Sequence, residues 1–261
     1  MIKKIMTAAL LVAVSAGSLA LTPQEQGLAI AIEGDKRGEG YGDSKVNLKM
    51  VLIDKKGRES ARDMRVKGLE GVEEGGDKSL MIFDTPRDQK GVAMLTFTHK
   101  AKSDDQWLFL PALKRVKKIS SRNKSGPFVG SEFAFEDISS QEVEKYTYKY
   151  LRDETFNGMD CFVVERIPTD KYSGYTKQLS WIDKAEYRAL KVEYYDRKKS
   201  LLKTLLNKDY KQYLGKFWRP GLSEMVNHQT GKSTRLIYDD YSFQVGLKKK
   251  EFTKNSLKRA R

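Results

Sequence analysis

The sequence predicts a mainly β protein built around one long, curled antiparallel sheet. Apolar and polar residues alternate with period two along most of the chain, and turn signals separate these runs at hairpin spacing. Few stretches have helical periodicity. A long antiparallel meander must protect its edges, so we expect the sheet to close or to curl.

One helix is expected directly after the first twenty residues. Thr22 is a suitable N-cap, Pro23 follows at the first helical position, and Glu25 completes a capping box. Gly34 and the glycine-rich run 38–42 are expected to end this helix. Three further stretches could be helical: 85–91, 131–139 and 250–257.

About eleven strands are expected. Their approximate ranges are 46–52, 64–66, 92–97, 107–110, 146–150, 162–166, 178–181, 190–194, 201–213, 215–219 and 232–243. Asn157-Gly158 is typical of a type I′ hairpin turn, and Lys55-Lys56-Gly57 is a second turn signal. No linker or internal repeat divides the chain, so residues 21–261 are expected to form a single domain.

The first twenty residues have the pattern of a secretory signal peptide. Lys3 and Lys4 precede an apolar run, and Ser18-Leu19-Ala20 offers small residues for cleavage after Ala20. The apolar run is too short to span a bilayer. We therefore expect 1–20 to be a cleaved signal peptide and the mature protein to be periplasmic.

Composition argues against most catalytic chemistry. A single cysteine, Cys161, rules out an intramolecular disulfide, and its apolar strand predicts a buried structural thiol. The two histidines, His99 and His228, lie far apart, and no nucleophile or nucleotide-binding motif is convincing. We expect no enzyme activity, no cofactor and no metal site.

The chain has a net charge of +14, and one stretch of it is strongly basic. Six basic residues without an acid lie within eleven positions: Lys114, Arg115, Lys117, Lys118, Arg122 and Lys124. A signal peptide and the lack of a binding motif argue against nucleic acid. The cluster is expected to dock on a membrane surface, anionic lipid or an acidic protein patch, unless it is simply a solvated face.

Aromatic residues occur on both faces of several expected strands, so both faces of the sheet need cover. A curled sheet partly covered by helices would leave an apolar cavity for a ligand. The residues could equally pack against the covering helices, and the sequence leaves both readings open. The candidates for an acyl-chain cavity are Leu95, Phe97, Trp107, Phe109, Phe133, Phe135 and Trp181. Phe133 and Phe135 follow the loop 126–130 and are candidates for a lid.

The central stretch resembles a known family. Residues 105–119, DQWLFLPALKRVKKI, resemble the W-L-Y-L-P-A-L-x-R-V-R-R-I stretch of the LolA-like outer membrane lipoprotein-sorting proteins. Residues 130–137 resemble the family's G-S-D-F-S-Y-x-D segment, with Glu132 and Phe135 in place of Asp and Tyr. The remaining chain matches in pattern only.

The resemblance implies an open half-barrel of about eleven antiparallel strands with a helical lid over a hydrophobic cavity. It implies a periplasmic carrier that binds acyl chains of a lipoprotein or lipid and shuttles them towards the outer membrane. The implied partners are an inner-membrane exporter of the resistance-nodulation-division type and an outer-membrane acceptor. The alternative is a periplasmic lipid- or protein-sensing binding module of the same fold.

Overall fold

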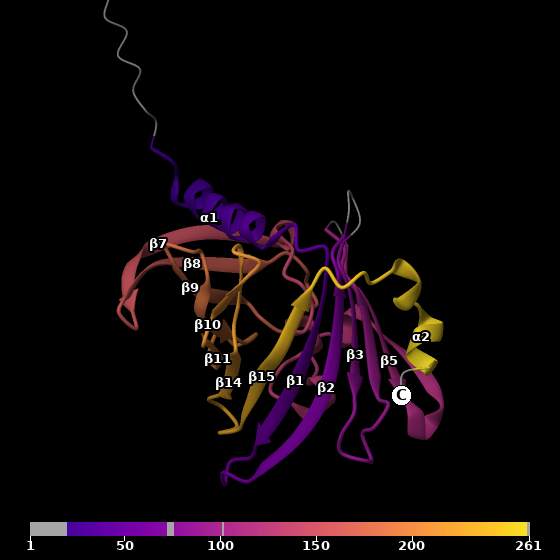
Figure 1. Cartoon of the computed structure of the whole chain (residues 1–261). Helices are drawn as coiled ribbons and strands as arrows, with labels where there is room; N and C mark the ends of the chain where they lie inside the picture. The colour runs from indigo at the N-terminus through magenta and orange to yellow at the C-terminus, as the bar shows by residue number, and fades with distance from the viewer. Residues whose placement is uncertain (1–19, 72–75, 101, 260–261) are drawn as a thin grey trace, which may run out of the picture.

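The computed structural model describes residues 20–71, 76–100 and 102–259, so the expected signal peptide lies outside the described residues apart from Ala20. Thirteen antiparallel strands form one sheet, and two short strands form a separate hairpin (Figure 1). The strands of the sheet are β1 (Asp43–Ile53), β2 (Glu59–Leu69), β3 (Lys78–Phe83), β4 (Ala93–Phe97), β5 (Asp105–Leu110), β6 (Arg115–Ile119), β7 (Tyr146–Phe156), β8 (Met159–Pro168), β9 (Lys177–Asp183), β10 (Ala189–Tyr195), β11 (Leu201–Lys208), β14 (Leu222–Asn227) and β15 (Ser233–Phe243). The hairpin strands are β12 (Lys211–Tyr213) and β13 (Phe217–Arg219).

The strand order is β6-β5-β4-β3-β2-β1-β15-β14-β11-β10-β9-β8-β7. Strands β6 and β7 are therefore the two edges, although only residues 120–145 separate them in the chain. No hydrogen-bonded ladder joins these edges, so the sheet is open, and Figure 1 shows how strongly its two halves bend relative to each other. The expectation of a mainly β, open and curled antiparallel sheet is confirmed.

The expected strand count is too low. Residues 78–83 form β3, but Leu80 to Phe83 are all buried, so the segment lacks the alternation by which strands are recognised. Residues 115–119 form β6, whereas the cluster of positive charges there predicts a docking loop. Residues 222–227 form β14 with a clear in-out burial pattern, and the range 201–213 is divided between β11 and β12.

Helix α1 (Pro23–Gly38) has the predicted capping box, in which the Thr22 hydroxyl accepts from the Glu25 amide at 3.2 Å. It continues past Gly34 and ends at Gly38, and an added Cβ at Gly34 would lie at an ordinary contact distance, 3.7 Å from the Tyr187 carbonyl oxygen. At Gly27 an added Cβ would lie 2.6 Å from the Tyr150 backbone nitrogen, so α1 lies almost directly on β7.

The other helical elements are short. The second α-helix is α2 (Lys254–Arg259), and six single 3-10 turns are η1 (Pro111–Leu113), η2 (Ser121–Asn123), η3 (Phe128–Gly130), η4 (Phe135–Asp137), η5 (Val143–Lys145) and η6 (Lys249–Glu251). The helix expected over 131–139 is wrong, because only η4 forms there, and 85–91 forms turns. Within the described ranges, no helix is both long and apolar enough to cross a membrane.

Both faces of the sheet are covered. The inner core lies on the face enclosed by the curl and includes Leu48, Met50, Met64, Met81, Phe83, Val92, Met94, Leu108, Ile119, Phe128, Phe133, Tyr175, Val192, Tyr194, Met225 and Leu236. The outer core lies on the opposite face of β3, β4 and β5 and includes Leu80, Ile82, Ala93, Leu95, Trp107, Phe109, Leu247, Phe252 and Leu257. A small third core contains Cys161, Val163, Trp181 and Leu190, and the predicted burial of Cys161 is confirmed.

Candidate functional site

The segment that joins the two edge strands fills the inside of the curled sheet. We call residues 120–145 the plug. Phe128 is fully buried and Phe133 nearly so, both within the inner core. The Phe128 ring lies 6.0 Å from the Phe83 ring of β3 and 5.6 Å from the Phe135 ring, in an edge-on arrangement. The plug therefore occupies the space in which an apolar ligand could contact the sheet.

Methionine is unusually frequent on the inner face. Five of the eight methionines in the chain belong to the inner core: Met50, Met64, Met81, Met94 and Met225. The methionine side chain is unbranched and polarizable, so it adapts to partners of different shape. This lining can thus pack against the rigid rings of the plug or against flexible hydrocarbon.

A buried ion pair fixes the middle of the plug to β11. The Lys203 ammonium, on a side chain only 5% exposed, donates to Asp137 Oδ2 at 2.7 Å and to the Glu132 carbonyl at 2.9 Å. The Tyr175 hydroxyl donates to Asp137 Oδ1 at 2.9 Å, and burial raises the pKa of Tyr175 well above its ordinary value. Removing one member of such a pair leaves an uncompensated buried charge and is strongly destabilising.

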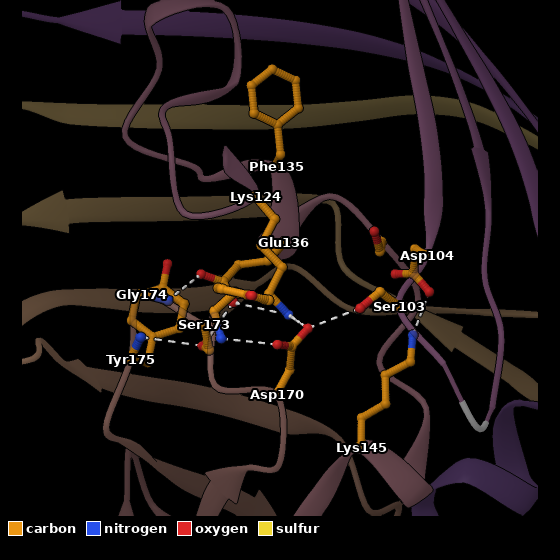
Figure 2. Close-up of polar contacts among 12 residues, drawn as sticks. Ser103, Asp104, Lys124, Phe135, Glu136, Lys145, Asp170, Ser173, Gly174 and Tyr175 are labelled. Carbon is orange, nitrogen blue, oxygen red and sulfur yellow. Dashed lines mark hydrogen bonds and ion pairs between the residues drawn. The ribbon is translucent and has the colours of Figure 1, made fainter. Parts of the chain in front are cut away.

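A second polar network holds the neighbouring part of the plug (Figure 2). The Glu136 carboxylate accepts from the Ser173 hydroxyl and from the Gly174 amide, both at 2.8 Å. Burial raises the pKa of Glu136 above its ordinary value. The Lys124 ammonium donates to Asp170 at 2.8 Å, and the Ser103 hydroxyl donates to the same carboxylate at 3.0 Å.

These contacts also bridge the opening between the two sheet edges, which we call the seam. Lys145, directly before β7, forms an ion pair with Asp104, directly before β5 (Figure 2). Ser103, on the same side as Asp104, contacts Asp170, which follows β8. Side-chain contacts thus span the seam where a closed barrel would have backbone hydrogen bonds, and such contacts can separate without disturbing the sheet.

A polar cavity of about 360 Å³ lies in the seam beside the plug, and we call it the seam cavity. Its walls come from residue 100 and from the segments 102–106, 119–124, 136–146 and 168–170. Four lysines and four carboxylates line it: Lys100, Lys102, Lys124, Lys145, Asp104, Glu136, Glu144 and Asp170. Hydroxyl and amide groups provide most of the remaining wall, so the cavity suits a polar, charged group rather than hydrocarbon.

The predicted acyl-chain residues do not share one cavity. Phe133 and Phe135 lie in or against the inner core, as parts of the plug. Four others lie in or against the outer core, beneath α2: Leu95, Phe97, Trp107 and Phe109. Trp181 belongs to the third core. The alternation of apolar and polar residues correctly predicted which residues share a face of the sheet. It did not predict which of the two faces the curl encloses.

The predicted docking residues divide in a similar way. Lys114, Arg115, Lys117 and Lys118 are exposed on and beside the edge strand β6, with Leu113 beside them 67% exposed. Arg122 lies in the plug over the ring of Tyr172, 5.7 Å from its centroid. Lys124 points into the seam network and is bound to Asp170. Lys118 is exposed but forms an ion pair with Asp105 at 2.7 Å. Among the described residues, Lys114, Arg115 and Lys117 are therefore the three of the six that are exposed and outside any ion pair or ring contact.

The sequence reasoning missed the residues that hold the plug. Lys203 lies in an alternating strand and reads as a solvent-facing lysine, yet it is buried beneath the plug. Glu136 and Asp137 hydrogen-bond to Gly174 and Tyr175, respectively. These contacts could not be predicted, because the two segments are far apart in sequence. Within the described residues, no group of three potential metal ligands occurs.

Comparisons with known proteins agree with this arrangement. A family model described as an uncharacterized protein matches residues 75–259, which is more than half of the chain. A putative outer membrane lipoprotein-sorting protein domain from Vibrio parahaemolyticus is 60% identical, with a TM-score of 0.88 over 90% of this chain and all of that one. No curated protein sequence matches the chain.

Two further solved structures are similar over 91% of this chain and the full length of each relative. A DUF1329 family protein from Desulfovibrio piger has a TM-score of 0.86 at 26% identity. A LolA superfamily protein from Nitrosomonas europaea has a TM-score of 0.70 at 25% identity. The open sheet and its covering elements are thus common to several proteins.

Proposed function

We propose that this chain, which belongs to the LolA-like family of outer membrane lipoprotein-sorting proteins, is a periplasmic carrier of acyl chains. The family consists of binding proteins rather than enzymes, as the sequence predicts. Its fold suggests a lipid-binding role. The cargo would be a lipoprotein or a lipid, taken from an inner-membrane exporter of the resistance-nodulation-division type and delivered towards the outer membrane.

One observation carries the proposal: the methionine-rich inner face is covered by a segment that polar side chains hold in place. Acyl chains would replace the rings of Phe128, Phe133 and Phe135 when the plug moves aside. Each buried methylene contributes about 0.8 kcal/mol, so a sixteen-carbon chain gains on the order of 10 kcal/mol before the costs of opening and ordering. This gain is of the same order as the loss of three buried ring contacts, at about 3–5 kcal/mol each.

The remaining parts of the proposal concern export and docking. Residues 1–20 would direct export and be removed, which leaves 21–261 as one carrier domain. The edge strand β6 would meet the exporter or an anionic membrane through Lys114, Arg115, Lys117 and Lys118, which are exposed and clustered. Exposed charges of this kind raise association rates and confer salt dependence more than they add affinity.

The test uses fatty acids brominated along the chain, which quench tryptophan on contact. None of the three tryptophans lies in the inner core, since Trp107 is in the outer core, Trp181 is in the third core and Trp218 contacts Arg188. Leu110→Trp places a reporter on β5 against the inner core, where the side chain is only partly buried. We expect strong quenching of the reporter and weak quenching of the wild-type protein.

Two results would overturn the proposal. Quenching that is equally strong in the wild-type protein would place the chains on an outer face. No saturable quenching in either protein would mean that no acyl chain is bound. Native mass spectrometry of protein purified from the periplasm identifies any lipid that it carries.

A further inference from the structure

The seam cavity and the inner core share a wall that is one side chain thick. Ile119 lines the cavity and also belongs to the inner core. Beside it, the Gln106 amide donates to the Phe135 carbonyl and to the Ser139 hydroxyl, both at 2.9 Å, and so closes the wall against the plug. Displacing only the ring-bearing part of the plug, residues 128–137, would remove the contact to Phe135 and join a polar chamber to an apolar one, while Glu144 and the other lining residues outside 128–137 stay in place. A molecule with a charged end and hydrocarbon tails fits the combined space.

The charges of the cavity are balanced but not all paired. Lys124 is bound by Asp170 and Lys145 by Asp104. Across the part of the chain that the structure describes, Lys100, Lys102 and Glu144 have no ion-pair partner. The cavity therefore offers two cationic groups and one carboxylate outside any ion pair, and Lys100 also lies near enough to Asp35 to oppose the effect of burial, which raises the pKa of that carboxyl. A purely anionic ligand would satisfy the lysines and meet the carboxylate as a like charge.

We propose that the seam cavity binds the phosphoethanolamine head group of a diacyl phospholipid, whose acyl chains lie on the inner face. The phosphate would meet Lys100 and Lys102, and the ammonium group would meet Glu144. Lysine binds phosphate as a compact point charge, and charge-assisted hydrogen bonds are about twice as strong as neutral ones. This inference rests on the proposed function, because it assigns the head group of a lipid whose chains occupy the inner face.

The size of the cavity agrees with this ligand. Pockets for small molecules enclose about 300–1,000 Å³ and hold a few placed polar groups. At about 360 Å³, the seam cavity can take a head group but not two additional acyl chains. The lipid must therefore divide between the two chambers, with its glycerol near Ile119 and Gln106.

The test compares three dioleoyl lipids that differ only in the head group: phosphatidylethanolamine, phosphatidylglycerol and diacylglycerol. Each is titrated as a competitor of a bound fluorescent fatty acid. In the wild-type protein we expect phosphatidylethanolamine to bind most tightly, about tenfold above diacylglycerol, with phosphatidylglycerol between them. The combined Lys100→Gln and Lys102→Gln variant should bind all three lipids equally.

Glu144→Gln should abolish only the difference between phosphatidylethanolamine and phosphatidylglycerol, since it removes the charge that favours ammonium. Lys249→Gln with Lys250→Gln is the matched control, because both lysines are exposed on η6 and do not line the cavity. The control should retain the wild-type order of affinities. All these substitutions keep a polar side chain of similar length, so folding should be preserved.

The outcomes separate this inference from the proposed function. Equal binding of the three lipids by the wild-type protein would overturn the head-group site while leaving the carrier function standing. If none of the three lipids, diacylglycerol included, displaces the fluorescent fatty acid, the carrier function itself is overturned. Free phosphoethanolamine is the last arm: if it binds as tightly as the lipid, the ligand is a soluble phosphate compound and the lipid assignment is wrong.

Discussion

The inner and outer cores bury similar side chains on opposite faces of the same strands, yet their covers differ. The outer core is closed by the C-terminal tail, in which Phe252 and Leu257 are almost completely buried against β4, β5 and β6. The inner core is closed by the plug, whose apolar rings are accompanied by a buried ion pair and the seam network. Both covers bury apolar side chains, and the outer cover also has polar contacts, from Asp43 to the amides of residues 245–247 and from Lys67 to Glu251. The covers differ in the number of polar contacts and in their depth, because the Lys203–Asp137 pair of the plug is only 5% exposed.

The difference teaches that burial alone does not identify a binding surface. Apolar contacts between a cover and a sheet have no substitute in water, so the outer cover should open only with global unfolding. Polar anchors exchange protein partners for water at a modest net cost, about 0.5–1.5 kcal/mol for a typical hydrogen bond. A plug held in this way can open locally, as binding segments commonly do.

The largest expected effect is on the outer core. Phe252→Ala removes a ring that is 2% exposed, and the loss of a buried phenyl group costs about 3–5 kcal/mol of unfolding free energy. Chemical denaturation measures the loss. The folded fraction should bind fluorescent fatty acid with wild-type affinity, because the outer core takes no part in binding. A selective loss of fatty-acid binding would place the ligand on the outer face.

Phe133→Ala should have a smaller effect on stability and a larger one on binding. Phe133 is also buried, at 4% exposure, but it lies in the plug. If the plug opens before the sheet unfolds, the loss of stability is limited by the free energy of plug opening, which is smaller than the free energy of global unfolding. The apparent affinity for fatty acid should rise, because a larger fraction of the protein is already open. A loss equal to that of Phe252→Ala, with unchanged affinity, would make the plug ordinary core.

The same contrast explains how far the sequence could be interpreted. Alternation in strands such as β10 reveals which residues share a face, and the Thr22 capping box predicts α1 correctly. Alternation cannot reveal which face of the sheet lies inside the curl. That depends on how distant strands pair, as β1 does with β15 and β11 with β14. Trp107 and Phe133 therefore appeared equivalent.

Buried charges were harder still to predict. Lys203 lies at a position where a lysine is normally solvated, and only the arrival of Asp137 from 66 positions away makes its burial tolerable. Strand β6 shows the opposite case, because its charged side chains are exposed as expected. Its pairing with β5 could not be predicted, because apolar and polar residues do not alternate along it.

A third prediction concerns the exposed charges of the edge strand β6, which take no part in anchoring either cover. Reversing Lys114, Arg115, Lys117 and Lys118 to Glu should change the unfolding free energy by about 0.5 kcal/mol or less at each exposed position. The change should be larger at Lys118, because its ion pair with Asp105 is lost. Binding to vesicles that contain anionic lipid should fall strongly and lose its salt dependence. Flotation with vesicles at several salt concentrations measures both effects.

The control carries the same change of net charge at other exposed turns. Lys55, Lys56, Lys198 and Lys199 are exposed and lie in the β1–β2 and β10–β11 turns. Reversing these four to Glu should weaken vesicle binding much less. Equal losses in the two variants would show that net charge, and not the edge strand, governs association.

The smallest expected effect is a pH dependence of plug opening. Burial raises the pKa of Glu136 above its ordinary value of 4.5, against the opposing influence of its hydrogen bonds to Gly174 and Ser173. Asp137 also raises this pKa, while the Lys124 ammonium, shared with Asp170, lowers it. In the opened plug, water surrounds Glu136 and its pKa returns towards 4.5. The closed state therefore binds the proton more tightly than the open state.

It follows that closure is most stable below pH 4.5 and weakens as the pH rises through the raised pKa of Glu136. Apparent fatty-acid affinity should accordingly increase over that interval and level off above it. Glu136→Gln, which keeps an oxygen acceptor for the Gly174 amide but cannot ionise, should show a flat profile. Asp239→Asn, at an exposed position of β15, should retain the wild-type slope. If the slope survives in Glu136→Gln, another group controls the plug, and the contrast between the two covers must rest on the Lys203–Asp137 pair alone.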